Sequence, residues 1–231
     1  MSQVRENLKR IQERIAKAAI RAGRQPEDVL LVAATKMNDS AKVREAVENG
    51  LTACGESRVQ EMLKKREEGA FGDAELHFIG HLQKNKVKSV VGVCSLIQSA
   101  DSPELLEAIA GKAVQKGIIQ PVLLEVNVGG EASKTGAPVE MVPQLLETAS
   151  SLEGILVKGL MTIPPYSDKI AKTRHYFDRM YRLFIDISAK KYDNINMCLL
   201  SMGMSDDFEE AILAGANIVR VGSAIFGERQ Y

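Results

Sequence analysis

The stretch Val29-Leu-Leu-Val-Ala-Ala-Thr35, followed at once by Lys36, decides the fold of this chain. Every residue before Thr35 in it is apolar, and a short continuous apolar run is typical of a β-strand that is buried on both faces of a parallel sheet. Upstream, apolar residues recur at helical spacing over residues 3–22. The chain is therefore predicted to open with an amphipathic helix and then to enter a buried strand.

Similar short apolar runs recur along the rest of the chain. They predict strands at residues 52–55, 76–80, 93–98, 122–128, 156–163, 198–202 and 218–226. Helical periodicity occupies most of the intervals, at residues 41–48, 59–67, 103–116, 139–150, 170–189 and 208–213. The connection at residues 84–91 is the weakest, since it is barely long enough for two helical turns. Strands that alternate with helices in this way pair in parallel through right-handed crossovers.

Two α/β architectures fit this alternation, a closed (β/α)8 barrel and an open doubly wound sheet. The strand count and the length of 231 residues favour the barrel, which typically has ~250 residues. No strand is followed by the G-x-G-x-x-G turn of a dinucleotide-binding sheet, and no Pro- or Ser-rich linker divides the chain. We predict a (β/α)8 TIM barrel with an additional N-terminal helix, forming a single domain over residues 1–231.

Composition excludes several classes of partner. Thirty basic and thirty acidic side chains cancel, so no net field attracts nucleic acid or an anionic membrane. The apolar runs are far shorter than the ~20 residues of a membrane span, and the N-terminus has no apolar signal core. Cys54, Cys94 and Cys198 are widely spaced, as in a reducing compartment. We expect a cytoplasmic protein, monomeric, with neither nucleic acid nor membrane as a partner.

The chemistry of a barrel lies at the carboxyl ends of its strands. Lys36 follows the first strand directly, where partial desolvation favours a neutral, nucleophilic amine. The loops after the last two strands supply Ser201 with Gly203, and Gly222 with Ser223. Glycine lets an anion approach backbone N–H groups and serine adds a hydroxyl donor, so these loops predict a phosphate site. The alternatives are a solvated surface lysine and glycines that serve only tight turns.

Other polar residues near the strand ends have simpler interpretations. Ser205 and Asp206 are left out of the phosphate site, because Asp206-x-x-Glu209 is the pattern of a capping box for the next helix. His77 and His81 flank an apolar strand and have no acidic cluster beside them, so they are interpreted as wall and edge residues and not as metal ligands.

A series of motifs resembles those of the pyridoxal phosphate homeostasis family. They are Ala33-Ala-Thr-Lys36, Gly55-Glu-Ser-Arg-Val-Gln-Glu61, His77-Phe-Ile-Gly-His-Leu-Gln83 with Asn85-Lys86, Gly159-Leu-Met-Thr-Ile163, Ser201-Met-Gly-Met-Ser205 with Asp207, and Arg220-Val-Gly-Ser-Ala-Ile-Phe-Gly227. The resemblance covers nearly the whole chain in one order, which is far more specific than any single motif. The family is similar to the barrel of fold-type III enzymes such as alanine racemase.

The resemblance implies pyridoxal 5'-phosphate as the cofactor, held as an imine on Lys36. It implies Ser201, Gly222 and Ser223 as phosphate contacts and Arg220 near the pyridine nitrogen. A guanidinium can only donate, so it should hold that nitrogen unprotonated and weaken the ring as an electron sink; the alternative is an arginine salt-bridged within the wall. Ser57 stands where the family usually has asparagine, which puts an amide contact in doubt.

The expected function is carriage of pyridoxal phosphate for its homeostasis, with pyridoxal-phosphate-dependent apoenzymes as recipients, and without robust catalysis. Racemisation needs a second acid or base opposite the lysine. In alanine racemase-like proteins it is a tyrosine of a further β-domain. Here Tyr231 ends the sequence, and none of the five tyrosines is a clear substitute, although Tyr166 follows the strand at residues 156–163 and could reach the rim of the barrel. The alternatives are a racemase or lyase of weak activity, and an aldolase-like barrel that uses Lys36 without the cofactor.

Overall fold

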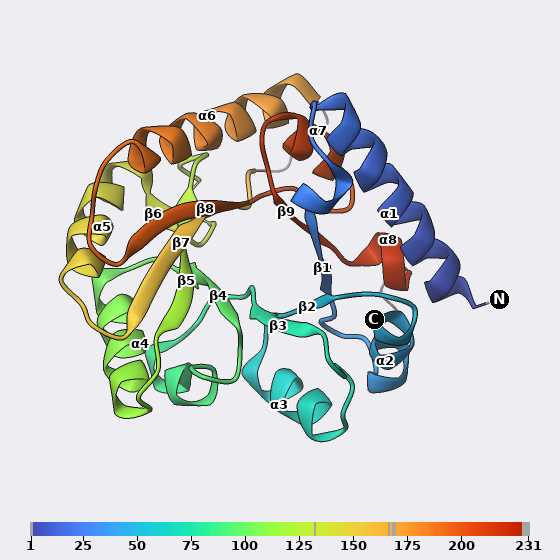
Figure 1. Ribbon diagram of the computed structural model, residues 1–231, viewed down its shortest axis with the longest axis horizontal. Coiled ribbons are helices and arrows are strands. Elements are labelled where there is room, and N and C mark those ends of the chain that lie inside the picture. Colours follow the sequence, from blue (N-terminus) through green and yellow to red (C-terminus); the bar gives the residue numbers. More distant parts are fainter. Residues whose placement is uncertain (1, 132, 166, 168–169, 228–231) are drawn as a thin grey trace. The chain divides into compact units, whose positions relative to one another are not determined.

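The computed structural model describes residues 2–131, 133–165, 167 and 170–227. Strands and helices alternate along this part of the chain as the sequence predicts (Figure 1). The chain divides into two compact units, residues 1–77 with 202–231 and residues 78–201.

The first unit is built around β1 (Leu30–Ala34), which pairs in parallel with β2 (Ala53–Glu56) on one side and with β9 (Ile218–Val221) on the other. β3 (Glu75–Phe78) lies beside β2. In the register of β1, Val32 is opposite both Ala53 and Arg220. The helices of this unit are α1 (Gln3–Arg21), α2 (Ser40–Glu48), α3 (Val59–Glu67), α7 (Phe208–Leu213) and α8 (Ser223–Phe226). The carboxyl ends of β1 and β9 therefore lie side by side.

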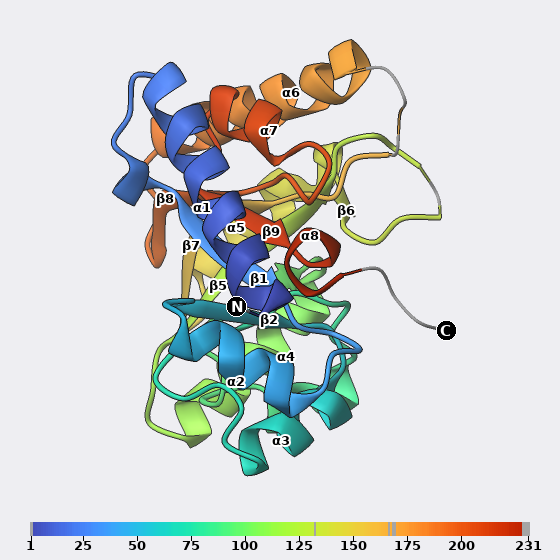
Figure 2. The ribbon, with the colours of Figure 1, turned by 90° about the vertical axis from the view of Figure 1, so that its right-hand side faces the viewer.

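The additional N-terminal helix is confirmed as α1, which lies along α7 and α8 (Figures 1 and 2). It begins at Ser2, whose hydroxyl accepts a hydrogen bond from the Arg5 N–H. Its apolar face is buried, with Val4, Leu8, Ile11 and Ile15 in the core.

On its other side, α1 is tied to α7. Arg14 binds the Glu209 carboxylate at 3.1 Å and lies 4.6 Å from the centre of the Phe208 ring. The predicted capping box of Asp206 with Glu209 is wrong: α7 begins after Asp207 without a side-chain cap, and Glu209 binds Arg14 instead. An arginine distant in sequence offers this carboxylate a stronger partner than a backbone N–H does.

The second unit is built from parallel strands. β5 (Gln120–Asn127) pairs with β4 (Leu96–Ala100) and β7 (Ile155–Met161), and β7 pairs with β8 (Ile195–Ser201). The two-residue β6 (Ala137–Pro138) pairs in parallel with the end of β5. The helices are α4 (Pro103–Gln115), α5 (Val142–Ser150) and α6 (Ile170–Ser188), and the weakest connection is a 3-10 helix, η2 (Lys84–Ser89).

Glycine is required within β7 because two strands approach closely there. A Cβ on Gly159 would lie 1.7 Å from the Leu199 carbonyl oxygen, and the residue has a φ of 153°. No side chain fits between β7 and β8 at this point.

The last strand is much shorter than predicted. The apolar run at residues 218–226 is a strand only as far as Val221, and residues from Ser223 onward form α8. The Ile225 and Phe226 N–H groups both donate to the Gly222 carbonyl. Apolar residues fit a buried strand or a buried helix equally well, so periodicity does not distinguish the two over so few positions.

Candidate functional site

Lys36 lies in a tight turn that follows the carboxyl end of β1. It is half-buried and lies two residues beyond Ala34, the last residue of the strand. The Asn38 N–H donates to the Thr35 carbonyl at 3.2 Å, and the Asn38 side-chain amide donates to the Lys36 carbonyl at 3.2 Å. Met37 between them adopts a left-handed conformation, with a φ of 63°. The backbone on both sides of Lys36 is thus held in one shape.

The end of β9 lies against the same strand end. A Cβ on Gly222 would lie 3.2 Å from the Ala34 carbonyl oxygen and 3.3 Å from the Ala34 Cβ. The Gly222 N–H points to the Ser205 Oγ at 3.4 Å, and the Ser223 Oγ lies 3.2 Å from that same oxygen. An N–H and two hydroxyls therefore converge beside the strand that carries Lys36. We call Ser205, Gly222 and Ser223 the donor group.

Ser205 is a residue that sequence reasoning missed. It was assigned to helix capping, but it lies three residues before α7 and contacts Gly222 and Ser223. The motif Ser201-Met-Gly-Met-Ser205 carried the signal, since two serines flank its glycine.

Arg220 lies on β9, opposite Val32, and its side chain is buried. The backbone N–H of Arg220 donates to the Gly203 carbonyl at 3.0 Å. This hydrogen bond joins β9 to the segment that carries Ser205. In that segment the Asp207 carboxylate accepts the Met204 N–H at 2.6 Å. Burial raises the pKa of Asp207, while that hydrogen bond and the positive charge of Arg220 act in the opposite direction. Arg220 thus has a carboxylate in its electrostatic surroundings.

Ser201 belongs to the second unit, at the end of β8. It is fully buried, and its hydroxyl donates to the Gln98 side chain on β4 at 2.6 Å. Lys36, Arg220, Gly222 and Ser223, the other predicted site residues, all belong to the first unit.

A buried polar network lies behind the Lys36 turn. The Lys65 ammonium on α3 donates to the Thr35 carbonyl at 2.6 Å and to the Glu56 and Glu61 carboxylates at 2.7 Å each. The Thr35 hydroxyl donates to the Glu56 Oε1 at 2.6 Å. We call Thr35, Glu56, Glu61 and Lys65 the Lys65 network. The sequence suggests that Glu56 pairs with Arg58 or with a lysine, and the structure identifies that partner as Lys65, which continues the buried stripe of Val59 and Met62 on α3.

Glu56 is the buried carboxylate of this network. Its side chain is fully buried, and desolvation raises the pKa of its carboxyl group above the ordinary value, although hydrogen bonds from Lys65 and Thr35 partly offset that rise. Its second oxygen, Oε2, has no hydrogen-bond partner within the described part of the chain. The charge of Glu56 therefore depends on the contacts that Oε1 makes with Lys65 and Thr35.

The histidines are not arranged as metal ligands. His77 is buried beside Glu75 at 3.2 Å, and burial lowers the pKa of His77. His81 lies 3.6 Å from Asp101. Within residues 2–131, 133–165, 167 and 170–227, no cluster of His, Cys, Asp or Glu side chains suits a metal ion, and no helix is long and apolar enough to span a bilayer.

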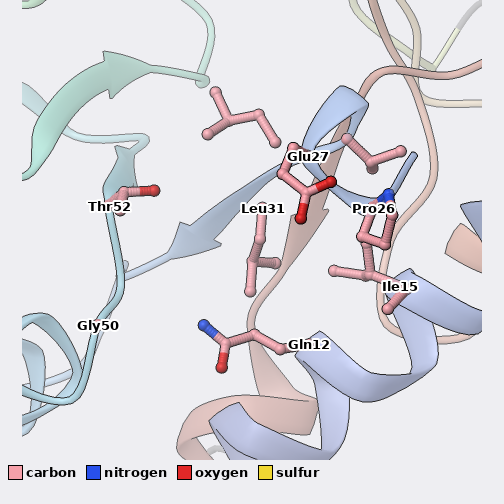
Figure 3. A pocket seen from close by; sticks show the side chains of 10 residues that line it. Gln12, Ile15, Pro26, Glu27, Leu31, Gly50 and Thr52 are labelled. Atoms are coloured by element: carbon pink, nitrogen blue, oxygen red, sulfur yellow. The ribbon is translucent and has the colours of Figure 1, made fainter.

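A pocket of about 390 Å³ opens at the other end of β1, away from Lys36 (Figure 3). Gln12 and Ile15 of α1 line it together with Leu31 and Thr52. Glu27 is the one charged side chain among its described lining residues. A site with that charge does not suit a phosphate.

The alternating elements and the lysine at the end of β1 define a class of protein, the barrels of alanine racemase type. The model of the family described as alanine racemase, N-terminal domain, matches residues 1–230. The fold is therefore a (β/α)8 TIM barrel with an additional N-terminal helix, as predicted. Within this class the chain belongs to the pyridoxal phosphate homeostasis family, since such a protein of Aquifex aeolicus is 46% identical over 226 residues, 98% of each chain.

Two solved structures are similar over nearly the whole chain. An unknown protein from Bifidobacterium adolescentis has a TM-score of 0.91 at 36% identity, over 97% of this chain and 94% of that one. PipY of Synechococcus elongatus PCC7942, solved with pyridoxal phosphate bound, has a TM-score of 0.83 at 31% identity, over 94% of this chain and 100% of that one. The resemblance read from the motifs is confirmed.

Proposed function

We propose that this protein binds pyridoxal 5'-phosphate as an imine on Lys36 and serves the homeostasis of that cofactor. The observation that carries the proposal is the position of Gly222 against Ala34, which places the donor group beside the strand end that bears the lysine. The name of the Aquifex aeolicus relative and the cofactor bound to PipY support it.

The residues present suit the cofactor. Gly222 has no side chain to block an anion, and the N–H and hydroxyls of the donor group can donate to phosphate oxygens. We assign phosphate contacts to Ser201, Gly222 and Ser223, to which the structure leads us to add Ser205. Arg220 would face the pyridine nitrogen, to which a guanidinium can only donate. When bound, pyridoxal phosphate supplies an aldehyde that condenses with amines and a ring that withdraws electrons.

We further propose that the chain acts as a single cofactor-binding domain and a monomer in the cytoplasm, without robust catalysis of its own. Pyridoxal-phosphate-dependent apoenzymes would be its recipients. Arg220 supports the non-catalytic assignment, because a guanidinium disfavours protonation of the ring nitrogen and so limits the electron-withdrawing power of the cofactor.

Borohydride reduction of the loaded protein should attach the pyridoxyl group to Lys36. Lys36 follows the end of β1, against which Gly222 of the donor group packs, so it is the lysine that we expect a phosphate held there to bring to the aldehyde. Peptide mapping by mass spectrometry measures the position. A label found chiefly on another lysine would refute the assignment, and the absence of any imine absorbance in the loaded protein would favour an aldolase-like use of Lys36 without the cofactor.

Membership of the alanine racemase family favours a second candidate, an amino-acid racemase of weak activity. We expect turnover below about 1 s⁻¹, the low end of typical enzyme rates, with alanine and other common amino acids. Incorporation of solvent deuterium at the α-carbon, with chiral analysis of the product, measures it. Faster turnover would establish the racemase. In that case Tyr166, which lies outside the described residues, would be the first residue to mutate.

A further inference from the structure

The buried ammonium of Lys65 binds the backbone immediately before Lys36. Lys65 has a side-chain exposure of only 4%, and its three N–H donors are all used, on the Thr35 carbonyl, the Glu56 carboxylate and the Glu61 carboxylate. Glu61 connects Lys65 to the residue after Lys36, because its Oε1 also accepts the Met37 N–H. The two residues that flank Lys36 are therefore both bound to the Lys65 network, one through its carbonyl and the other through its amide.

Met37 shows that this anchoring acts on a strained segment. It and Asn194 are the residues other than glycine that have a positive φ in the described part of the chain. Asparagine tolerates that conformation, whereas a long side chain such as methionine adopts it rarely and only where its surroundings impose it. The Met37 side chain is half exposed, so core packing does not account for it. The hydrogen bond from the Met37 N–H to Glu61 holds the backbone of Met37 directly, in addition to the bonds that Asn38 makes to the Thr35 and Lys36 carbonyls.

We propose that Lys65 and Glu61 are positioning residues for Lys36: they lock the turn Thr35–Met37 in the conformation that aims the Lys36 amine at the cofactor. This inference rests on the proposed function. The direction in which a side chain leaves the backbone depends on the φ and ψ of its own residue and its neighbours. When two reacting groups are held together on a protein, a displacement of one of them by about 1 Å lowers the rate of their reaction about a hundredfold.

The network and the donor group act on different parts of the cofactor. Ser205, Gly222 and Ser223 lie on the segments around β9, whereas the network joins β1, β2 and α3. Loss of a network contact should therefore leave phosphate binding intact and alter the imine. A residue with a merely structural role would lower stability without changing the rate at which bound cofactor forms the imine.

Glu61→Ala is the first test, because Glu61 is partly exposed and its loss leaves Lys65 paired with Glu56. We expect imine formation, followed by absorbance after pyridoxal phosphate is added to the apoprotein, to slow about tenfold, as for loss of one charge-assisted hydrogen bond. Total bound cofactor, measured by equilibrium dialysis, should stay within about twofold. Glu61→Gln keeps a carbonyl acceptor and should restore most of the rate. The matched control is Glu67→Ala, an exposed carboxylate on the same helix, which should behave as wild type.

A double-mutant cycle with Met37→Asn tests the route through the turn. Asparagine favours the left-handed conformation, so the loss caused by Glu61→Ala should shrink in the Met37→Asn background. An equal loss in both backgrounds, or a wild-type rate in Glu61→Ala, would overturn the inference. These outcomes are distinct from failure of the proposed function, in which the wild-type protein itself would form no imine on Lys36.

Discussion

Replacing Gly222 with leucine is expected to weaken the binding of pyridoxal phosphate by about 100-fold or more. Even a Cβ at this position would lie 3.2 Å from the Ala34 carbonyl oxygen, so a larger side chain must move β9 or turn into the space between the N–H and hydroxyl donors. Hydrogen bonds to a charged group are worth about 1.5–3 kcal/mol each, and the loss of two of them accounts for the effect. Equilibrium dialysis of cofactor into the apoprotein measures it.

Two variants make this result interpretable. Lys36→Ala should abolish the imine absorbance yet retain measurable non-covalent binding, because the donor group is untouched. Gly111→Leu is the matched control. A Cβ on Gly111 in α4 meets no atom within 4 Å, so this substitution should leave binding unchanged. Retention in Gly222→Leu that equals or exceeds retention in Lys36→Ala would contradict the view that phosphate contacts set the affinity.

Replacing Lys65 with methionine is expected to lower the free energy of unfolding by about 3–5 kcal/mol at neutral pH. The substitution keeps most of the volume but removes the ammonium from Glu56, a fully buried carboxylate whose Oε2 already has no described partner. Removing one partner of a buried ion pair leaves an uncompensated charge, which is far more costly than losing a surface pair. Urea denaturation of the apoprotein measures the change.

The deficit of Lys65→Met should shrink in acid. Desolvation already raises the pKa of Glu56 above its ordinary value of 4.5, and loss of the bonds from Lys65, which act to lower it, should raise it further. A carboxyl with a raised pKa binds its proton more tightly in the folded state, so the penalty is absent below the unfolded pKa and grows as the pH rises above it. We therefore expect the variant to approach wild type below about pH 4.5.

Lys64→Met provides the control for that experiment. Lys64 neighbours Lys65 on α3, but its side chain is 75% exposed and its nearest partner, Glu68, is 3.9 Å away. Exposed pairs of this kind contribute about 0–1 kcal/mol. A deficit in Lys65→Met that matches the one in Lys64→Met, or that does not depend on pH, would show that the ammonium does not stabilise Glu56.

The positions of the strands were predictable, and the assignment of polar residues near their ends was only partly so. Gly222 and Ser223 stay predicted phosphate contacts; in the structure Gly222 packs against Ala34 at the end of β1, and the Ser223 hydroxyl lies beside that of Ser205. Ser205 was assigned to a cap, because local spacing offers a capping pattern whether or not a distant strand brings other partners. Arg14 is such a distant partner: it lies 195 positions from Glu209 in the sequence and donates hydrogen bonds to its carboxylate.

The sequence by itself determined the order of strands and helices, the amphipathic first helix and the position of Lys36 at the end of β1. Burial leaves a pattern in the sequence, because a buried strand needs a short apolar run and a half-buried helix needs apolar residues at helical spacing. Only the tertiary structure decided that Lys65 is buried among Thr35, Glu56 and Glu61, that the N–H of left-handed Met37 donates to Glu61, and that Ser205 contacts Gly222 and Ser223. Those contacts join residues of different elements. Their energies depend on distance and desolvation in the folded chain, and spacing along the sequence specifies neither.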